Sequence, residues 1–213
     1  MNGGPGTDPR LAARHALIAG LVPEGARVLD VGCGDGVLLA RLAAERGARG
    51  YGLEIDGADV ARAVARGLSV VQGDAEADLQ GYPDAGFGAV VLSNSLQALR
   101  APVPALRQAV RVGERAVVSF PNFGHWRVRA SLARTGRMPR SRALPQEWHE
   151  TENIHLCTVL DFLDLCRAEG MAVDAAYGVN GARSWPFTPE RAGAANLRAQ
   201  EAVFVVRQGC RQG

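Results

Sequence analysis

A short run of glycines between acidic residues carries the clearest chemistry in this chain. Residues 30–36 read Asp-Val-Gly-Cys-Gly-Asp-Gly, directly after an apolar run and directly before a stretch of helical spacing. Glycines in this setting let the backbone turn tightly and lie against a ligand, and the following helix offers free N–H groups to it. The candidate ligand contacts in this loop are Gly32, Cys33, Gly34 and Gly36.

Three acidic residues are spaced to reach the same ligand. Asp30 suits a cationic or amino-bearing ligand rather than a pyrophosphate, or it orders the loop by accepting its N–H groups. Glu54 follows about 20 residues later, where a carboxylate accepts from both ribose hydroxyls; the alternative is a side chain in solvent. Asp74, next to Ala75, is either an acceptor for an adenine amino group or a helix N-cap.

The glycine spacing separates two classes of ligand. The chain has Gly-x-Gly-x-Gly over residues 32–36, whereas NAD-binding loops have Gly-x-Gly-x-x-Gly. An NAD-dependent oxidoreductase is therefore the least favoured reading.

Alternating strands and helices position these residues. Apolar runs alternate with stretches of helical spacing, which predicts an α/β domain with a mostly parallel sheet and helices on both faces. The predicted strands are 27–31, 50–55, 68–72, 87–92, 115–120, 171–177 and 201–206. The predicted helices are 10–19, 37–46, 58–66, 103–112 and 158–169.

The chain length suits one domain. We expect it to span residues 10–207, between a Gly- and Pro-rich tail at 1–9 and a short tail at 208–213. The regular pattern breaks after residue 120. Residues 121–157 are therefore expected to form an irregular lid or insertion on the side where the carboxyl ends of the strands open.

This insertion holds the best candidates for a substrate pocket. They are Asn122, His125, Trp126, Trp148, His149, Asn153 and His155. His125 or His155 is a candidate general base near neutral pH. The alternative is that the aromatic residues pack the insertion and that backbone groups satisfy each histidine.

Two polar residues follow the predicted fourth strand. Ser93 is placed on the cofactor side and Asn94 on the substrate side. Either side chain can bind a ligand or cap the next segment.

The charge pattern does not indicate nucleic acid or an acidic membrane as partner. The net charge is +2, and all 24 basic residues are arginine. One arginine run lies in the insertion and is either an anion-binding or partner-docking face or a solvated helix face. Its members are Arg127, Arg129, Arg134, Arg137, Arg140 and Arg142.

The cysteines and the apolar pattern predict the cellular compartment of the protein. The four cysteines form no Cys-x-x-Cys pair, so no metal site is expected. Cys33 is read as a small loop residue rather than a nucleophile. With neither a signal peptide nor a membrane-length apolar run, we expect a soluble cytoplasmic protein with reduced thiols.

Residues 27–120 resemble the class I S-adenosylmethionine-dependent methyltransferases. The loop at 30–36 is similar to motif I of that superfamily, and Glu54 and Asp74 match its ribose and adenine positions. The resemblance implies a Rossmann-like fold with a seven-stranded sheet whose last strand is reversed. It also implies S-adenosylmethionine or S-adenosylhomocysteine as the ligand.

Longer strings resemble one family, that of the methionine biosynthesis protein MetW, over residues 11–171. These strings are 91–97, 119–126, 136–139, 144–148 and 153–158. The resemblance implies a role in methionine biosynthesis and, for some members, a homoserine O-acyltransferase as partner. The family usually has Tyr-Asp-Thr after Trp148, where this chain has His149-Glu150-Thr151, so the family's substrate preference is not carried over to this segment.

A catalytic signature is missing beside the cofactor motif. The chain lacks Asn-Pro-Pro-Tyr after the fourth strand, which argues against methylation of adenine or glutamine nitrogen. Methyl transfer from a sulfonium to a good nucleophile depends mostly on alignment. Two functions therefore stay open: a protein of methionine biosynthesis that binds S-adenosylmethionine and acts with an acyltransferase, and an independent methyltransferase with an unidentified small-molecule substrate.

Overall fold

The computed structural model describes residues 9–140, 146–151 and 153–209. Most of the predicted N-terminal tail, the last four residues of the chain and Arg142 of the arginine run therefore lie outside the described residues.

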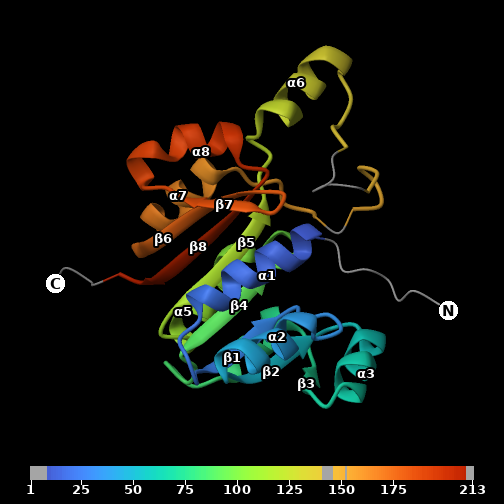
Figure 1. Cartoon of the computed structure of the whole chain (residues 1–213), viewed down its shortest axis with the longest axis vertical. Helices are drawn as coiled ribbons and strands as arrows, with labels where there is room; N and C mark the ends of the chain where they lie inside the picture. Colours follow the sequence, from blue (N-terminus) through green and yellow to red (C-terminus); the bar gives the residue numbers. More distant parts are fainter. Residues whose placement is uncertain (1–8, 141–145, 152, 210–213) are drawn as a thin grey trace.

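A mixed sheet in the order β3-β2-β1-β4-β5-β8-β6-β7 forms the centre of the described molecule (Figure 1). Its strands are β1 (Arg27–Val31), β2 (Arg49–Glu54), β3 (Ser69–Gln72), β4 (Ala89–Ser93), β5 (Ala116–Pro121), β6 (Met171–Asn180), β7 (Arg183–Pro186) and β8 (Glu201–Gln208). The first five strands are parallel to one another. β8 runs antiparallel between β5 and β6, which confirms the class I methyltransferase fold with its reversed late strand.

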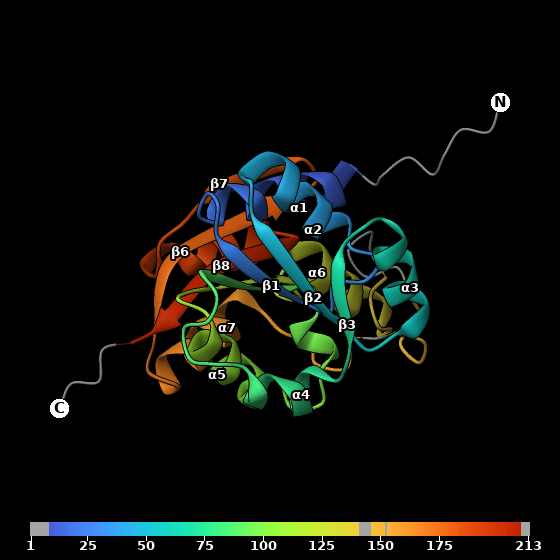
Figure 2. The same ribbon diagram turned by 90° about the horizontal axis from the view of Figure 1, so that it is seen from below.

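Helices cover both faces of this sheet, as expected (Figure 2). They are α1 (Pro9–Leu21), α2 (Val37–Arg46), α3 (Gly57–Ala65), α4 (Ala75–Asp78), α5 (Pro102–Val112), α6 (Trp126–Thr135), α7 (Val159–Ala168) and α8 (Ala192–Arg198). None of these helices is long and apolar enough to cross a membrane.

The two hydrophobic clusters follow the alternation of the strands. Val28 packs with α1 and α2 on one face, whereas its neighbour Leu29 packs with α5 and α7 on the other. Phe120, Phe162 and Phe204 are fully buried and join β5, α7 and β8 on the second face. The first helix is tied to β8 by an ion pair of 2.6 Å between Arg14 of α1 and Glu201.

The structure adds elements that the sequence pattern did not reveal. β7 forms a hairpin with the end of β6 and is an eighth, partly exposed edge strand whose residues lack an apolar alternation. α6 lies inside the insertion that was predicted to be irregular. Its sequence is arginine-rich and its apolar stripe is short, with Val128 as its one buried residue, so the helix is hard to recognise from sequence.

Candidate functional site

The glycine loop connects the end of β1 to the start of α2. Gly32 and Gly34 have φ values of +72° and +54°, a region that residues with a Cβ rarely adopt. A Cβ on Gly32 would lie 2.8 Å from Cβ of Ser95, so this glycine permits close packing. A Cβ on Gly34 would meet no atom within 4 Å, because Gly34 faces an open cleft.

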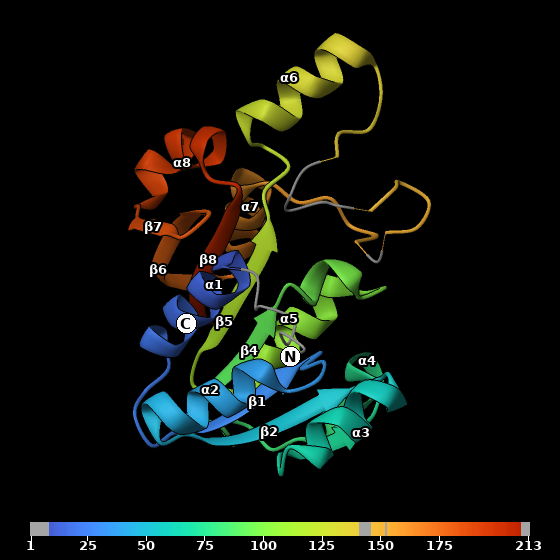
Figure 3. The same ribbon diagram turned by 45° about the vertical axis from the view of Figure 1, so that its right-hand side comes forward.

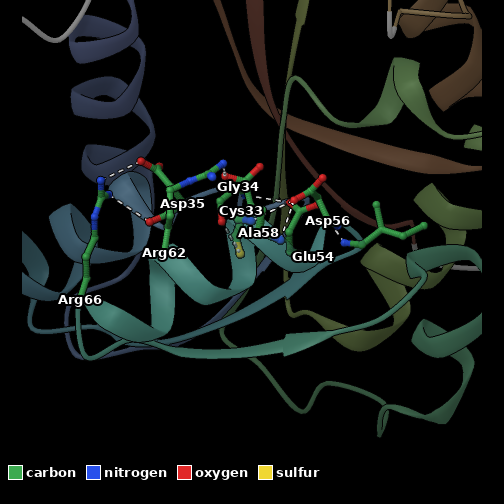
Figure 4. Close-up of polar contacts among 10 residues, drawn as sticks. Cys33, Gly34, Asp35, Glu54, Asp56, Ala58, Arg62 and Arg66 are labelled. Carbon is green, nitrogen blue, oxygen red and sulfur yellow. Dashed lines mark hydrogen bonds and ion pairs between the residues drawn. The ribbon is translucent and has the colours of Figure 1, made fainter. Parts of the chain in front are cut away.

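Glu54, at the end of β2, holds the loop in this shape (Figure 4). Its Oε2 accepts from the Gly34 N–H at 2.8 Å, and its Oε1 accepts from the N–H groups of Ile55 and Asp56 at 2.8 and 3.0 Å. The role of ordering the loop, which the sequence offered to Asp30, is thus performed by Glu54. A carboxylate has about four acceptor positions, so Glu54 retains capacity for a ligand hydroxyl.

Asp30 lies below the loop and is 1% exposed. Its Oδ1 has no hydrogen-bond partner among the described residues. Burial, with the nearby Glu54 carboxylate as a second cause, raises the pKa of Asp30 to about 7. Asp30 is therefore a buried acid that ionises near neutrality and supplies negative charge beneath the loop.

Replacing Asp30 by asparagine is expected to stabilise the protein progressively more as the pH rises. The pKa of Asp30 is about 7 in the folded protein, against an ordinary value of 3.8. Between these values the folded state binds more protons than the unfolded state. Wild-type stability therefore falls as the pH rises through this window and stays at the lower level above it. Asparagine does not ionise, so the variant keeps its stability as the pH rises.

Urea unfolding of both proteins from about pH 5 to about pH 8 measures the effect. A stability difference that stays constant over this range would show that Asp30 is already ionised at the acidic end.

The cleft in front of the loop has a volume of about 670 Å³. The carboxyl ends of β1, β2 and β4 form its floor, as expected for the ligand crevice of an open α/β sheet. Predicted residues that line it are Gly32, Gly34, Glu54, Asp74, Ala75, Ser93 and Asn94.

The two roles predicted for Asp74, helix N-cap and ligand acceptor, are compatible in the structure. Its Oδ1 accepts from the N–H of Glu76 at 2.9 Å and so caps α4. The same residue also lines the cleft, with Ala75 beside it. Asp74 can therefore fix α4 and still present an acceptor to a ligand.

Cys33 and Gly36 do not line this cleft. The Cys33 side chain points beneath the loop, because a Cβ on Gly52 of β2 would lie 2.5 Å from its Sγ. Burial raises the pKa of the Cys33 thiol to about 12, which agrees with its reading as a loop residue rather than a nucleophile. Gly36 is the N-cap of α2.

Several cleft residues carried no sequence signal that singled them out. They are Ile55, Asp56, Asp59, Glu76, Ser95, Leu99 and Arg100. Ser93 and Ser95 have buried hydroxyl groups without a hydrogen-bond partner in the described residues. Both flank Asn94, whose φ of +59° marks a constrained backbone turn that only the structure reveals.

The predicted substrate cluster does not form one pocket. Asn122 is 2% exposed, and its amide bonds to backbone groups of Gly124, of the start of α7 and of the end of α8. His125 is 4% exposed and caps α6 by accepting the Arg127 N–H on Nδ1. Burial, followed by the charge of Arg127, lowers the pKa of His125. Both residues therefore hold the local backbone together, which is the alternative to a substrate contact.

The other members of that cluster are spread over the surface. Trp148 and Asn153 line a separate hollow beside α6. Trp126 and His149 are exposed, and His149 lies 3.9 Å from Glu150. His155 lines a small apolar pocket of about 180 Å³, and its Nε2 lies 3.3 Å from the carbonyl oxygen of Arg100 at the cleft rim.

Comparisons with known protein families and sequences agree with one another. The family model described as methionine biosynthesis protein MetW matches residues 12–206. A protein of Rhodopirellula baltica, the bifunctional methionine biosynthesis protein MetXA/MetW, is 31% identical over 177 residues. That match covers 79% of this chain but only 28% of the relative. The chain thus spans less than a third of that two-function protein.

Solved structures share the fold at low sequence identity. An S-adenosylmethionine-dependent methyltransferase of Mesorhizobium loti has a TM-score of 0.65 at 21% identity, covering 95% of this chain and 99% of that one. One from Thermotoga maritima has a TM-score of 0.65 at 16% identity, covering 94% and 90%. The [4+2]-cyclase SpnF has a TM-score of 0.64 at 20% identity, covering 96% and 86%. The fold alone therefore does not specify the reaction.

Proposed function

Because the chain belongs to the family of the methionine biosynthesis protein MetW, we propose that it binds S-adenosylmethionine or S-adenosylhomocysteine and acts with a homoserine O-acyltransferase. The observation that supports this most is the cleft at the glycine loop, with Glu54 on one side and Asp74 on the other. We also propose a cytoplasmic location, because methionine synthesis is a metabolic role.

The charge of the cleft supports a cationic ligand. Its lining includes five acidic residues, namely Glu54, Asp56, Asp59, Asp74 and Glu76, and one basic residue, Arg100. Asp30 adds a buried acid beneath it. This field attracts a sulfonium or an ammonium group and repels the pyrophosphate of a dinucleotide.

The polar groups of the cleft also fit a nucleoside. Glu54 would accept from one ribose hydroxyl, and Asp74 from the adenine amino group. Ser93 and Ser95 also line the cleft, and their hydroxyls have no hydrogen-bond partner among the described residues. When bound, the sulfonium cofactor supplies an activated methyl group, and the residues of this chain hold and orient it.

The partner is inferred from the relative that joins two functions. The protein of Rhodopirellula baltica carries MetXA, which is the homoserine O-acyltransferase, and MetW on one chain. The two functions are therefore joined there. The same pairing between separate chains is our proposal for this protein. Bound S-adenosylmethionine, the activated form of methionine, would then signal to the acyltransferase how much of the pathway's product is available.

An independent methyltransferase is the second candidate. Its support is the fold and the open cleft, because alignment alone can promote methyl transfer to a reactive acceptor. The described cleft lining includes no histidine, and His125 is buried away from it. The described lining thus supplies no histidine as a general base, so this candidate depends on an acceptor that is already reactive or on one of the cleft carboxylates.

Replacing Glu54 by glutamine is expected to weaken ligand binding by about 10- to 150-fold, the range of a hydrogen bond to a charged group. One of its oxygens becomes an amide NH₂, which cannot accept from Gly34 or from a ribose hydroxyl. Calorimetric titration with S-adenosylmethionine and S-adenosylhomocysteine measures the change. Glu24→Gln, in an exposed turn outside the cleft lining, is the matched control.

Two results would contradict this assignment. If wild type binds neither compound at millimolar concentration, the cofactor proposal is wrong. If Glu54→Gln binds as tightly as wild type, the ligand lies elsewhere.

A further inference from the structure

The described residues between α6 and Leu156 expose several large apolar side chains. Those at least 44% exposed are Trp126, Leu132, Met138, Trp148, Ile154 and Leu156, and we call these six residues the lid surface. Exposed apolar side chains that gather on a soluble protein mark sites that another molecule covers, and four of these six line one hollow. The lid surface is therefore a candidate contact face.

Part of the lid surface is concave. Met138, Trp148, Ile154 and Leu156 line one hollow of about 1110 Å³ between the end of α6 and the segment that leads to α7. This hollow and the cofactor cleft have no lining residue in common. A molecule docked here can thus leave the cofactor cleft open.

α6 extends away from the sheet at one end of the molecule (Figures 1 and 3). Val128 is its one buried residue, and Leu132, one turn further along the same face, is 47% exposed. The helix has ten residues, a length that is marginal in water without tertiary packing. Its apolar face therefore lacks most of the cover that would stabilise it.

The charge of α6 indicates what kind of surface covers it. The helix contains Arg127, Arg129 and Arg134 and no acidic residue. Arg127 also lies over the ring of Trp126 at 5.2 Å, and such tryptophan and arginine side chains are frequent interface anchors. The complementary surface is apolar with acidic residues at its rim.

We propose that the lid surface docks the homoserine O-acyltransferase. This inference rests on the proposed function, in which that enzyme is the partner. The relative that joins both functions on one chain shows that the two proteins can be held together, and a lasting contact needs a face of this kind. A concave hollow suits a protein protrusion better than the flat surface of a membrane.

Binding of this chain to the homoserine O-acyltransferase of the same organism tests the proposal. Leu132→Glu and Trp148→Ala are each expected to weaken the complex at least tenfold in calorimetry or interferometry. Val64→Glu, at a 52% exposed position on α3, is the matched control and should bind like wild type. All three variants should bind S-adenosylhomocysteine as wild type does, because their sites lie outside the cleft lining.

The outcomes separate the two proposals. If wild type forms a complex and both lid variants bind equally well, the docking face is wrong and the partnership stands. If wild type forms no complex, the partnership is wrong and the docking proposal with it, whatever the result for cofactor binding.

Two further measurements test other occupants of the lid surface. If sedimentation shows a wild-type dimer that Leu132→Glu dissolves while acyltransferase binding is unchanged, the face is assigned to a second copy. If wild type binds phosphatidylserine vesicles and Leu132→Glu does not, while acyltransferase binding is unchanged, the lid surface is assigned to a membrane. Either result overturns the proposal.

Discussion

Replacing Gly34 by valine is expected to abolish binding of S-adenosylmethionine and S-adenosylhomocysteine while the domain stays folded. The Cβ position of Gly34 is open because it faces the cleft, so the two methyl groups of valine would stand where the ligand lies. The φ of +54° adds backbone strain of about 1–3 kcal/mol. We expect at least a 100-fold loss of affinity, equivalent to about 2.7 kcal/mol or more.

The matched control is Gly25→Val. Gly25 has a φ of +67° and also meets no atom within 4 Å of a Cβ, but it lies in the turn before β1 and not in the cleft. Both variants should therefore lose similar stability in urea unfolding, and only Gly34→Val should lose ligand binding. Equal binding by the two variants would place the ligand outside this cleft.

Replacing Asn122 by alanine is expected to lower the free energy of unfolding by about 3–5 kcal/mol, the scale of breaking a buried polar network. Its Nδ2 donates to the carbonyl oxygens of Asn196 and Ala199 at 2.7 and 2.8 Å. Its Oδ1 accepts from the N–H groups of Gly124 and Val159 at 2.9 and 3.3 Å. Alanine leaves these buried backbone groups without Asn122 as a partner.

Asn122→Asp distinguishes this structural role from a substrate contact. Aspartate keeps an acceptor for Gly124 but turns an oxygen toward two carbonyl oxygens, so it should destabilise the protein as well. Asn153→Ala is the control, because the Asn153 side chain reaches only Thr151 Oγ1 among the bonds described. Denaturant unfolding measures all three variants, and a wild-type midpoint for Asn122→Ala would contradict this role.

The cofactor side of the site could be predicted from sequence because its residues are local. A glycine loop between a strand and a helix, and acids at the ends of the next two strands, converge wherever parallel strands end together. Glu54 and Asp74 therefore reach the cleft with the loop. The detail that Glu54 holds Gly34 was not predictable, because it depends on side-chain direction across two strands.

The substrate side could not be predicted in the same way. Asn122 and His125 lie close in sequence to exposed residues, but the chain turns inward at the end of β5 and buries both. Polar residue type does not reveal that turn, since a buried cap and a ligand contact use the same groups. α6 was missed because its apolar stripe is short and its sequence is rich in arginine.

The position of β8 has a consequence for how the protein is made. β8 is the last strand along the chain, yet it lies between β5 and β6 and bonds to both. While a ribosome is still adding residues 201–208, β5 has an open edge and the β6–β7 hairpin has no strand to join. The parallel strands that carry the cofactor cleft can pair before that moment, whereas the sheet closes only after it. An interrupted chain would thus expose an apolar strand edge that is prone to aggregation.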